Sequence, residues 1–139
     1  MTDQPSATET DDQRHGRFLL TAGAFSAAAT VLLGAFAAHA LKHQLPNHAM
    51  AIFHTGVDYQ FWHALGLMVI GLIIEREICV ERSWLAGRLM LAGSLIFSIS
   101  LYLLAVTGLK WLGAITPIGG ILMVSAWLVL GTALARRRR

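Results

Sequence analysis

Apolar residues along this chain gather into four long runs separated by shorter polar connections. The runs cover residues 18–41, 55–74, 85–107 and 111–135. Each is long enough to cross the ~30 Å hydrocarbon core of a bilayer as a helix, which takes about 20 mostly apolar residues. No run has the continuous charged stripe that a helix on the surface of a soluble bundle carries. The pattern predicts an all-α fold, an integral membrane bundle of four transmembrane helices.

The composition favours the same fold class. The chain has 139 residues, of which 55% are hydrophobic and 14% are charged. In an ordinary soluble domain about 25% of the residues are charged. So few charges cannot cover the surface of a soluble protein of this size. We expect one transmembrane domain over residues 18–135, surrounded by the lipid bilayer.

Both ends of the chain are polar. Residues 1–17 begin with an acidic segment that contains a proline, and we predict that they form a disordered tail. The first run ends in an A-x-A pattern, which is typical of signal-peptide cleavage. However, it is longer than the roughly 7–15 apolar residues of such peptides, so it is expected to remain as the first helix. Residues 136–139 form a basic tail.

The distribution of positive charge predicts the orientation in the membrane. Nine of the eleven Lys and Arg residues precede the first run, lie in or beside the second connection, or follow the fourth run. Only Lys42 and Lys110 lie in the other two connections. Because positive residues favour the cytoplasmic side, both termini are expected in the cytoplasm and the protein in the inner membrane.

The basic tail consists of Arg136, Arg137, Arg138 and Arg139. Each arginine close to an anionic membrane surface contributes about 1 kcal/mol of attraction. We therefore expect this tail to contact anionic lipid, and we do not expect nucleic acid as a partner.

Ionisable side chains open the second run, where residues 53–63 read FHTGVDYQFWH. At a rise of ~1.5 Å per residue, Asp58 lies about 5 Å and His63 about 12 Å below the outer end of the run. Such groups are costly in hydrocarbon and suggest a functional site, although they also serve as hydrogen bonds between helices. The candidates for a ligand site or proton relay in the outer half are Asp58, His63, Tyr59, Gln60, Tyr102 and His39.

Small and polar residues recur every four positions in two of the runs. These residues are Ser26, Thr30, Gly34 and Ala38 in the first run, and Ser94, Ser98 and Tyr102 in the third. Small residues let helix backbones approach closely in lipid. In the fourth run, Pro117 removes a backbone hydrogen bond, and Gly119 and Gly120 follow it. We predict a kink there that serves packing or acts as a hinge.

Five of the six histidines lie in or face the outer half, which raises the alternatives of a metal or haem site. The pairs His39/His43 and His54/Asp58 have the i,i+4 spacing that suits a shared metal ion. No complete metal-binding motif accompanies them, and haem would need two histidines at matched depth. We assign no metal and no other cofactor, and His39, His43 and His54 remain the candidate ligands for any metal.

The chain has no recognisable catalytic motif. We find no nucleophile–base pair, no glycine-rich phosphate loop and no HExxH sequence. Asp58 and His63 lie about 140° apart on their helix and are not expected to touch each other. The expectation is that the protein is not an enzyme.

Four segments resemble one known family. They are GAFAAHALK at residues 34–42, HTGVDYQFWHALGLM at 54–68, FSISLYLLAV at 97–106 and WLGAITPIGG at 111–120. In order and spacing they are similar to the small inner-membrane proteins of domain-of-unknown-function family 423 (DUF423). Asp58 stands where glutamate is also familiar in that family. The resemblance implies a multi-pass membrane protein of helices and supplies no substrate.

Taken together, these features predict a non-enzymatic bundle whose polar outer-half site binds or conducts a small molecule, an ion or a proton. The alternative is a structural or accessory subunit of a membrane complex, with a homo-oligomer or a membrane partner protein. A metal-binding protein and an intramembrane enzyme are further alternatives with less support from the residues.

Overall fold

The computed structural model describes residues 10–136, and four long helices account for nearly all of them. These are α1 (Asp11–Phe36), α2 (Asn47–Glu75), α3 (Val80–Thr107) and α4 (Leu112–Arg136), with a π-helical turn η1 (Ala37–Leu41) directly after α1. The described part of the chain contains no strand. All four helices are long and apolar enough to cross a membrane. The predicted all-α membrane fold with four spans is confirmed.

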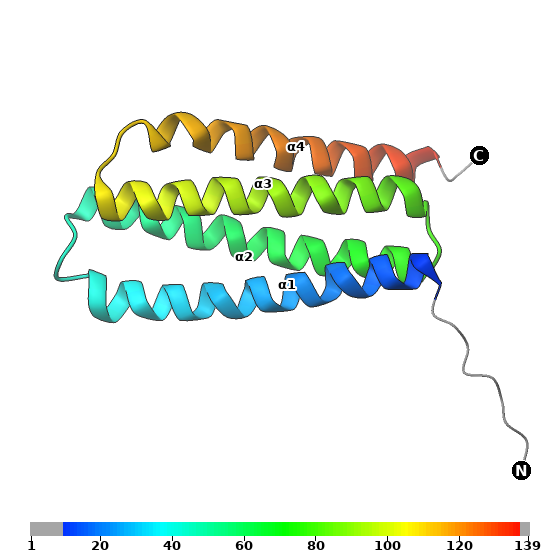
Figure 1. Ribbon diagram of the computed structural model, residues 1–139, viewed down its shortest axis with the longest axis horizontal. Coiled ribbons are helices and arrows are strands. Elements are labelled where there is room, and N and C mark those ends of the chain that lie inside the picture. Colours follow the sequence, from blue (N-terminus) through cyan, green and yellow to red (C-terminus); the bar gives the residue numbers. More distant parts are fainter. Residues whose placement is uncertain (1–9, 137–139) are drawn as a thin grey trace, which may run out of the picture.

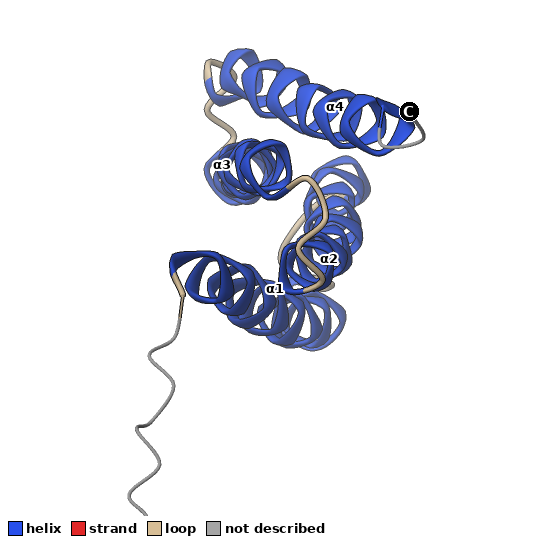
Figure 2. Cartoon of the chain, turned by 90° about the vertical axis from the view of Figure 1, so that its right-hand side faces the viewer, coloured by secondary structure: helices blue, strands red, loops and turns tan. Residues whose placement is uncertain are grey.

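Successive helices run in opposite directions, so the start of α1 and the end of α4 lie at the same end of the molecule (Figure 1). We call this the terminal end, and it also carries the connection between α2 and α3. The opposite end, here the far end, carries the other two connections. The helices pack in chain order, α1 on α2, α2 on α3 and α3 on α4. Viewed along their axes they form a zigzag, with α1 and α4 on opposite outer sides (Figure 2).

The first helix begins earlier than predicted. We expected residues 11–17 to belong to a disordered tail, but they form the first turns of α1. A capping box starts the helix: the Thr10 hydroxyl accepts from the Gln13 amide at 3.3 Å, and the Gln13 side chain accepts from the Thr10 amide at 3.0 Å. The ring of His15 also stacks on Trp84 of α3 at 4.1 Å between centroids. Residues 1–9 and 137–139 lie outside the described residues.

The second helix also begins earlier than predicted, at Asn47 rather than at residue 55. The extended backbone of Pro46 precedes it, so only residues 42–46 connect it to η1. The extra turns are held by tertiary packing, because Phe53 is buried in a cluster with Ala37 and Leu41 of η1 and Ala105 of α3.

Glycines set the closest approaches between helices. A methyl group added at Gly23 of α1 would lie 2.7 Å from the Ala64 carbonyl oxygen of α2, and one added at Gly71 of α2 would lie 2.8 Å from that of Gly16. The pair Gly93 and Gly119 makes the equivalent contact between α3 and α4. Close contact of this kind stabilises helix pairs in lipid, where no water is excluded by association.

The predicted packing residues divide between contact and open surface. Gly119 lies at the closest contact of α3 with α4, whereas a methyl group added at Gly34 would meet only Val57, at 3.9 Å. A methyl group added at Gly120 would meet nothing within 4 Å. Helix α4 continues through Pro117 without interruption.

The two neighbouring glycines of α4 give a matched test of this packing. Gly119→Ala is expected to lower the free energy of unfolding by about 1–3 kcal/mol, because the methyl group would lie 2.5 Å from the Phe97 backbone nitrogen. Gly120→Ala is expected to be neutral or stabilising by up to about 1 kcal/mol, since alanine favours helix more than glycine does. Unfolding in mixed micelles, followed by circular dichroism, measures both. Equal losses would contradict the packing role of Gly119.

Candidate functional site

A buried amide links three helices near the middle of the bundle. Gln60 of α2 is only 7% exposed. Its Nε2 donates to the Ser26 hydroxyl of α1 at 3.2 Å and reaches the Ser26 carbonyl oxygen at 3.4 Å. Its Oε1 accepts from the Tyr102 hydroxyl of α3 at 2.8 Å. Because an unpaired amide is costly in an apolar medium, these bonds hold α1, α2 and α3 together at one level.

A glycine positions the tyrosine for this bond. A methyl group added at Gly56, one turn from Gln60 on α2, would lie 2.7 Å from the ring of Tyr102. The ring packs closely over α2 there, and its other neighbour is Phe53 at 4.8 Å between centroids. The missing side chain at Gly56 therefore lets the tyrosine lie against α2 with its hydroxyl at Gln60.

Ser98 lies beside this hydrogen-bonded chain. It is one turn from Tyr102 on α3 and only 1% exposed. Its side chain lies within hydrogen-bonding reach of the Tyr102 phenol. Nevertheless, its Oγ makes no hydrogen bond to any group in residues 10–136. We refer to Ser26, Gln60, Ser98 and Tyr102 as the three-helix polar cluster.

His63 is buried next to this cluster, and both of its ring nitrogens already have hydrogen-bond partners. Its Nδ1 lies 2.7 Å from the Tyr59 carbonyl oxygen, and its Nε2 lies 3.4 Å from the indole nitrogen of Trp127 on α4. A carbonyl only accepts and an indole N–H only donates. The proton therefore sits on Nδ1, and Nε2 accepts from Trp127, which makes the imidazole neutral. His63 joins α2 to α4 and has no free nitrogen for a proton relay.

Within residues 10–136, Asp58 and His39 form no hydrogen bond with the cluster, although Asp58 lies near enough to Tyr102 to act on its phenol electrostatically. We expected these residues to converge with His63 and Tyr102, but both are exposed. At 100° per residue, Asp58 lies about 160° around α2 from Gln60, on a face that also carries the exposed Phe61, Leu65 and Val69. Neither residue is buried beside Tyr102 as expected, because apolar residues surround α2 and do not mark its buried face.

The remaining candidates lie at the edge of the cluster or outside it. Tyr59 is 46% exposed and stacks on Phe97 of α3 at 4.7 Å between centroids. No group of three or more His, Cys, Asp or Glu side chains comes together within residues 10–136 in a way that could hold a metal ion. The candidate metal ligands His39, His43 and His54 are each exposed.

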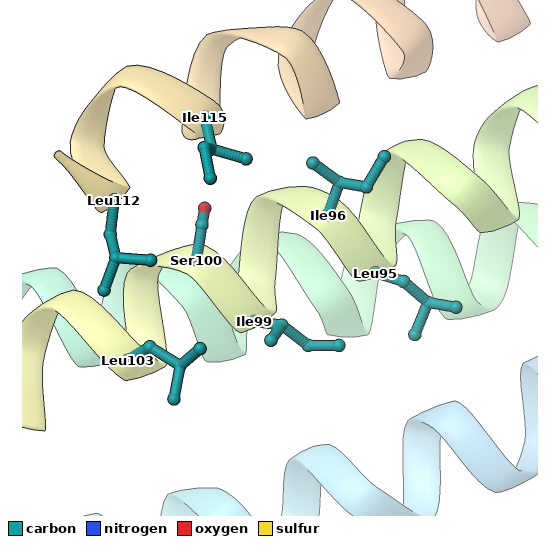
Figure 3. Close-up of a pocket in the computed structure, with 7 residues that line it drawn as sticks. All are labelled: Leu95, Ile96, Ile99, Ser100, Leu103, Leu112 and Ile115. Atoms are coloured by element: carbon teal, nitrogen blue, oxygen red, sulfur yellow. The ribbon is translucent and has the colours of Figure 1, made fainter.

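An apolar hollow of about 280 Å³ lies between α3 and α4, near the far end (Figure 3). Its lining residues are Leu95, Ile96, Ile99, Ser100, Leu103, Leu112 and Ile115. The only polar side chain among them, Ser100, bonds the Phe97 carbonyl oxygen and the Thr116 hydroxyl, each at 2.8 Å. With its one polar group already paired, the hollow offers nothing to orient a polar ligand.

A family model described as "Protein of unknown function (DUF423)" matches residues 33–120. The chain belongs to this family. The matched region holds three of the four residues of the three-helix polar cluster, and Ser26 precedes it. No solved structure matches the chain.

Several relatives of this DUF423 protein are named as membrane proteins. It is 42% identical to the UPF0382 membrane protein YwdK of Bacillus subtilis, over 80% of this chain and 90% of the relative. A UPF0382 membrane protein of Staphylococcus epidermidis is 47% identical, over 78% of this chain and 87% of the relative. The one from Staphylococcus haemolyticus, SH2409, is 41% identical over 82% and 92%. These names agree with a multi-pass protein of the bacterial membrane.

Sequence reasoning found His63, Gln60 and its partner Tyr102, but it did not find Ser26 and Trp127, which bond Gln60 and His63. Ser26 and Ser98 were assigned only to stripes of small and polar residues spaced by four. Their place on those stripes was the available sign that they face neighbouring helices. Trp127 carried no signal, because a tryptophan in an apolar run looks the same whether it faces lipid or a buried histidine.

Two tryptophans test the assignment of His63. In the wild type, nitrogen NMR is expected to show a neutral imidazole protonated at Nδ1. Trp127→Phe should lower the free energy of unfolding by about 1–3 kcal/mol, because it leaves Nε2 buried without a donor. Trp62→Phe is the control, since Trp62 is 65% exposed, and it should change stability little. An imidazole protonated at Nε2 in the wild type would contradict the assignment.

Proposed function

We propose that this DUF423 protein is a non-enzymatic membrane protein that binds a small neutral hydrogen-bonding molecule at the three-helix polar cluster. The observation that carries the proposal is the hydroxyl of Ser98, which is buried within reach of Tyr102 and yet forms no hydrogen bond to any group in residues 10–136. Nearly all buried polar groups in proteins have a hydrogen-bond partner. A buried group that lacks one costs the folded state about 1–3 kcal/mol. A ligand that pairs with this hydroxyl would recover that energy.

The chemistry of the cluster restricts the ligand. The Tyr102 hydroxyl donates a hydrogen bond to Gln60, and its oxygen can still accept one. Ser98 both donates and accepts. A molecule with a hydroxyl or amide group would satisfy both. The cluster itself contains no carboxylate. Asp58 acts on the Tyr102 phenol only electrostatically, from an exposed position on the other side of α2, so a neutral ligand suits the cluster better than a cation does.

The same arrangement favours binding over proton conduction or catalysis. A relay needs groups that exchange protons, and His63 is held neutral by Tyr59 and Trp127. Two serines, an amide and a phenol also lack the nucleophile–base pair on which covalent catalysis depends. We further propose that the terminal end faces the cytoplasm, because six of the eight Lys and Arg residues within residues 10–136 lie towards that end of the molecule, and only Lys42 and Lys110 lie at the far end.

Ser98→Ala tests the ligand site. Native mass spectrometry of the full chain released from lipid nanodiscs is expected to show a bound small molecule in the wild type and none in Ser98→Ala. Ser100→Ala is the control, because Ser100 is paired across α3 and α4. It should lose about 0.6 kcal/mol of stability and keep the ligand.

Two results would contradict the proposal. One is the same bound mass in both serine variants. The other is a bare wild-type protein that is as stable as Ser98→Ala, as expected if the Ser98 hydroxyl simply turns to the carbonyl oxygen of its own helix.

Asp58 favours a second candidate function, that of an accessory subunit. Its carboxylate is exposed on an apolar face of α2, among Phe61 and Leu65. A charged group within a membrane span is costly unless it is paired or reaches water. A partner helix that presents a hydrogen-bond donor to this face would pair it.

Native gels of detergent-solubilised membranes test this second function. Asp58→Leu is expected to release the protein from a larger complex, whereas Leu65→Val on the same face should leave the complex intact. Migration at the same size in both variants and the wild type would exclude a partner held by Asp58.

A further inference from the structure

Two hollows on the outer surface of α1 join at Thr21. The first, of about 330 Å³, is lined by Arg14, Arg17, Phe18 and Thr21. The second, of about 510 Å³, is lined by Leu20, Thr21, Ala24, Phe25, Ala28 and Met68. Each is within the size range of ligand pockets, about 300–1,000 Å³. Together they form one groove along α1, which we call the α1 groove.

The helix geometry explains the shape of the groove. Residues 14, 17, 21, 24 and 28 are spaced by three or four, so they lie on one face of α1. The short side chains of Thr21, Ala24 and Ala28 form its floor. The exposed rings of Phe18 and Phe25 stand on one side, and Leu20 and Met68 stand on the other. From Arg14 to Ala28 the groove runs about 21 Å along the helix axis, comparable to an extended lipid acyl chain.

Positive charge is confined to one end of the groove. Arg14 and Arg17 lie at the terminal end, and the remaining lining residues are uncharged. Arg14 pairs with Asp11 at 3.5 Å, but both side chains are largely exposed, and exposed pairs of this kind are weak. A guanidinium group matches the geometry of a phosphate. The groove thus combines a phosphate-binding end with a narrow apolar channel.

We propose that the α1 groove binds one anionic phospholipid. Arg14 and Arg17 hold its phosphate, and an acyl chain lies over Thr21, Ala24 and Ala28 between the two phenylalanines and Met68. The charge at one end and the apolar length beyond it fit this molecule better than they fit free phosphate, which would leave the channel unused. This inference is independent of the ligand proposed for the three-helix polar cluster.

The arginines are tested with the full chain in nanodiscs that contain equal amounts of phosphatidylglycerol and phosphatidylcholine. Native mass spectrometry counts the lipids that remain bound after release. The double variant Arg14→Gln/Arg17→Gln is expected to retain phosphatidylglycerol on the order of tenfold less than the wild type does. Arg76→Gln/Arg88→Gln removes the same charge from residues that do not line the groove, and it should leave retention within about twofold.

The channel is tested with the arginines in place. Ala28→Phe fills the floor and is expected to reduce phosphatidylglycerol retention as the arginine variant does. Ala92→Phe, at an exposed position of α3, should not. Circular dichroism during thermal unfolding verifies that each variant remains folded.

Three outcomes would overturn the proposal. They are equal loss of lipid in both arginine variants, unchanged retention in Ala28→Phe, and unchanged retention in every variant together with loss of a copurifying protein from Ala28→Phe. The last outcome would assign the groove to a partner helix instead.

Discussion

Close backbone contact at glycines is the constraint on which the rest of this structure depends. In a bilayer the association of helices excludes no water, so it relies on dispersion forces and on hydrogen bonds between helices. Contacts at Gly16, Gly23 and Gly71 bring α1 against α2, and Gly93 with Gly119 brings α3 against α4. Only at this separation can one glutamine side chain reach a serine on one neighbour and a tyrosine on the other.

Helix α2 forms side-chain hydrogen bonds with each of the other three helices. It meets α1 through Gln60 and Ser26, α3 through Gln60 and Tyr102, and α4 through His63 and Trp127. Its buried face combines glycines with polar groups: Gly56 admits the tyrosine ring, and Gly66 lies against Met90 and Trp127. The buried polar residues in the middle of this span, Gln60 and His63, therefore use their hydrogen-bonding groups to hold the helices together. The buried hydroxyl of Ser98 is therefore informative, because it forms no hydrogen bond to any group in residues 10–136.

The sequence predicted the four spans and the family, because span length and motif order do not depend on how helices face one another. Which side of a helix is buried does depend on it, and here the sequence was insufficient. Asp58 and Gln60 are two residues apart and were both candidates, yet one faces outward and the other forms the centre of the cluster. In a soluble helix a polar stripe would have marked the outer face, whereas in lipid the outer face is apolar too. The start of α2 was missed for a related reason, because its first turns are held by packing of Phe53 on η1 rather than by their own hydropathy.

The open arrangement of the helices explains why the two proposed sites differ in chemistry. Where α1, α2 and α3 meet, the polar groups are shielded from lipid, so a group left unpaired there calls for a small polar partner. Helix α1 packs chiefly on α2, with a contact to α3 near the terminal end where Leu19 meets Gly87 and His15 meets Trp84. Its outer face is consequently in contact with the bilayer, and a groove on that face selects among lipids. A closed bundle would have buried this face of α1, whereas the zigzag leaves it free with the arginines of the first turns at its end.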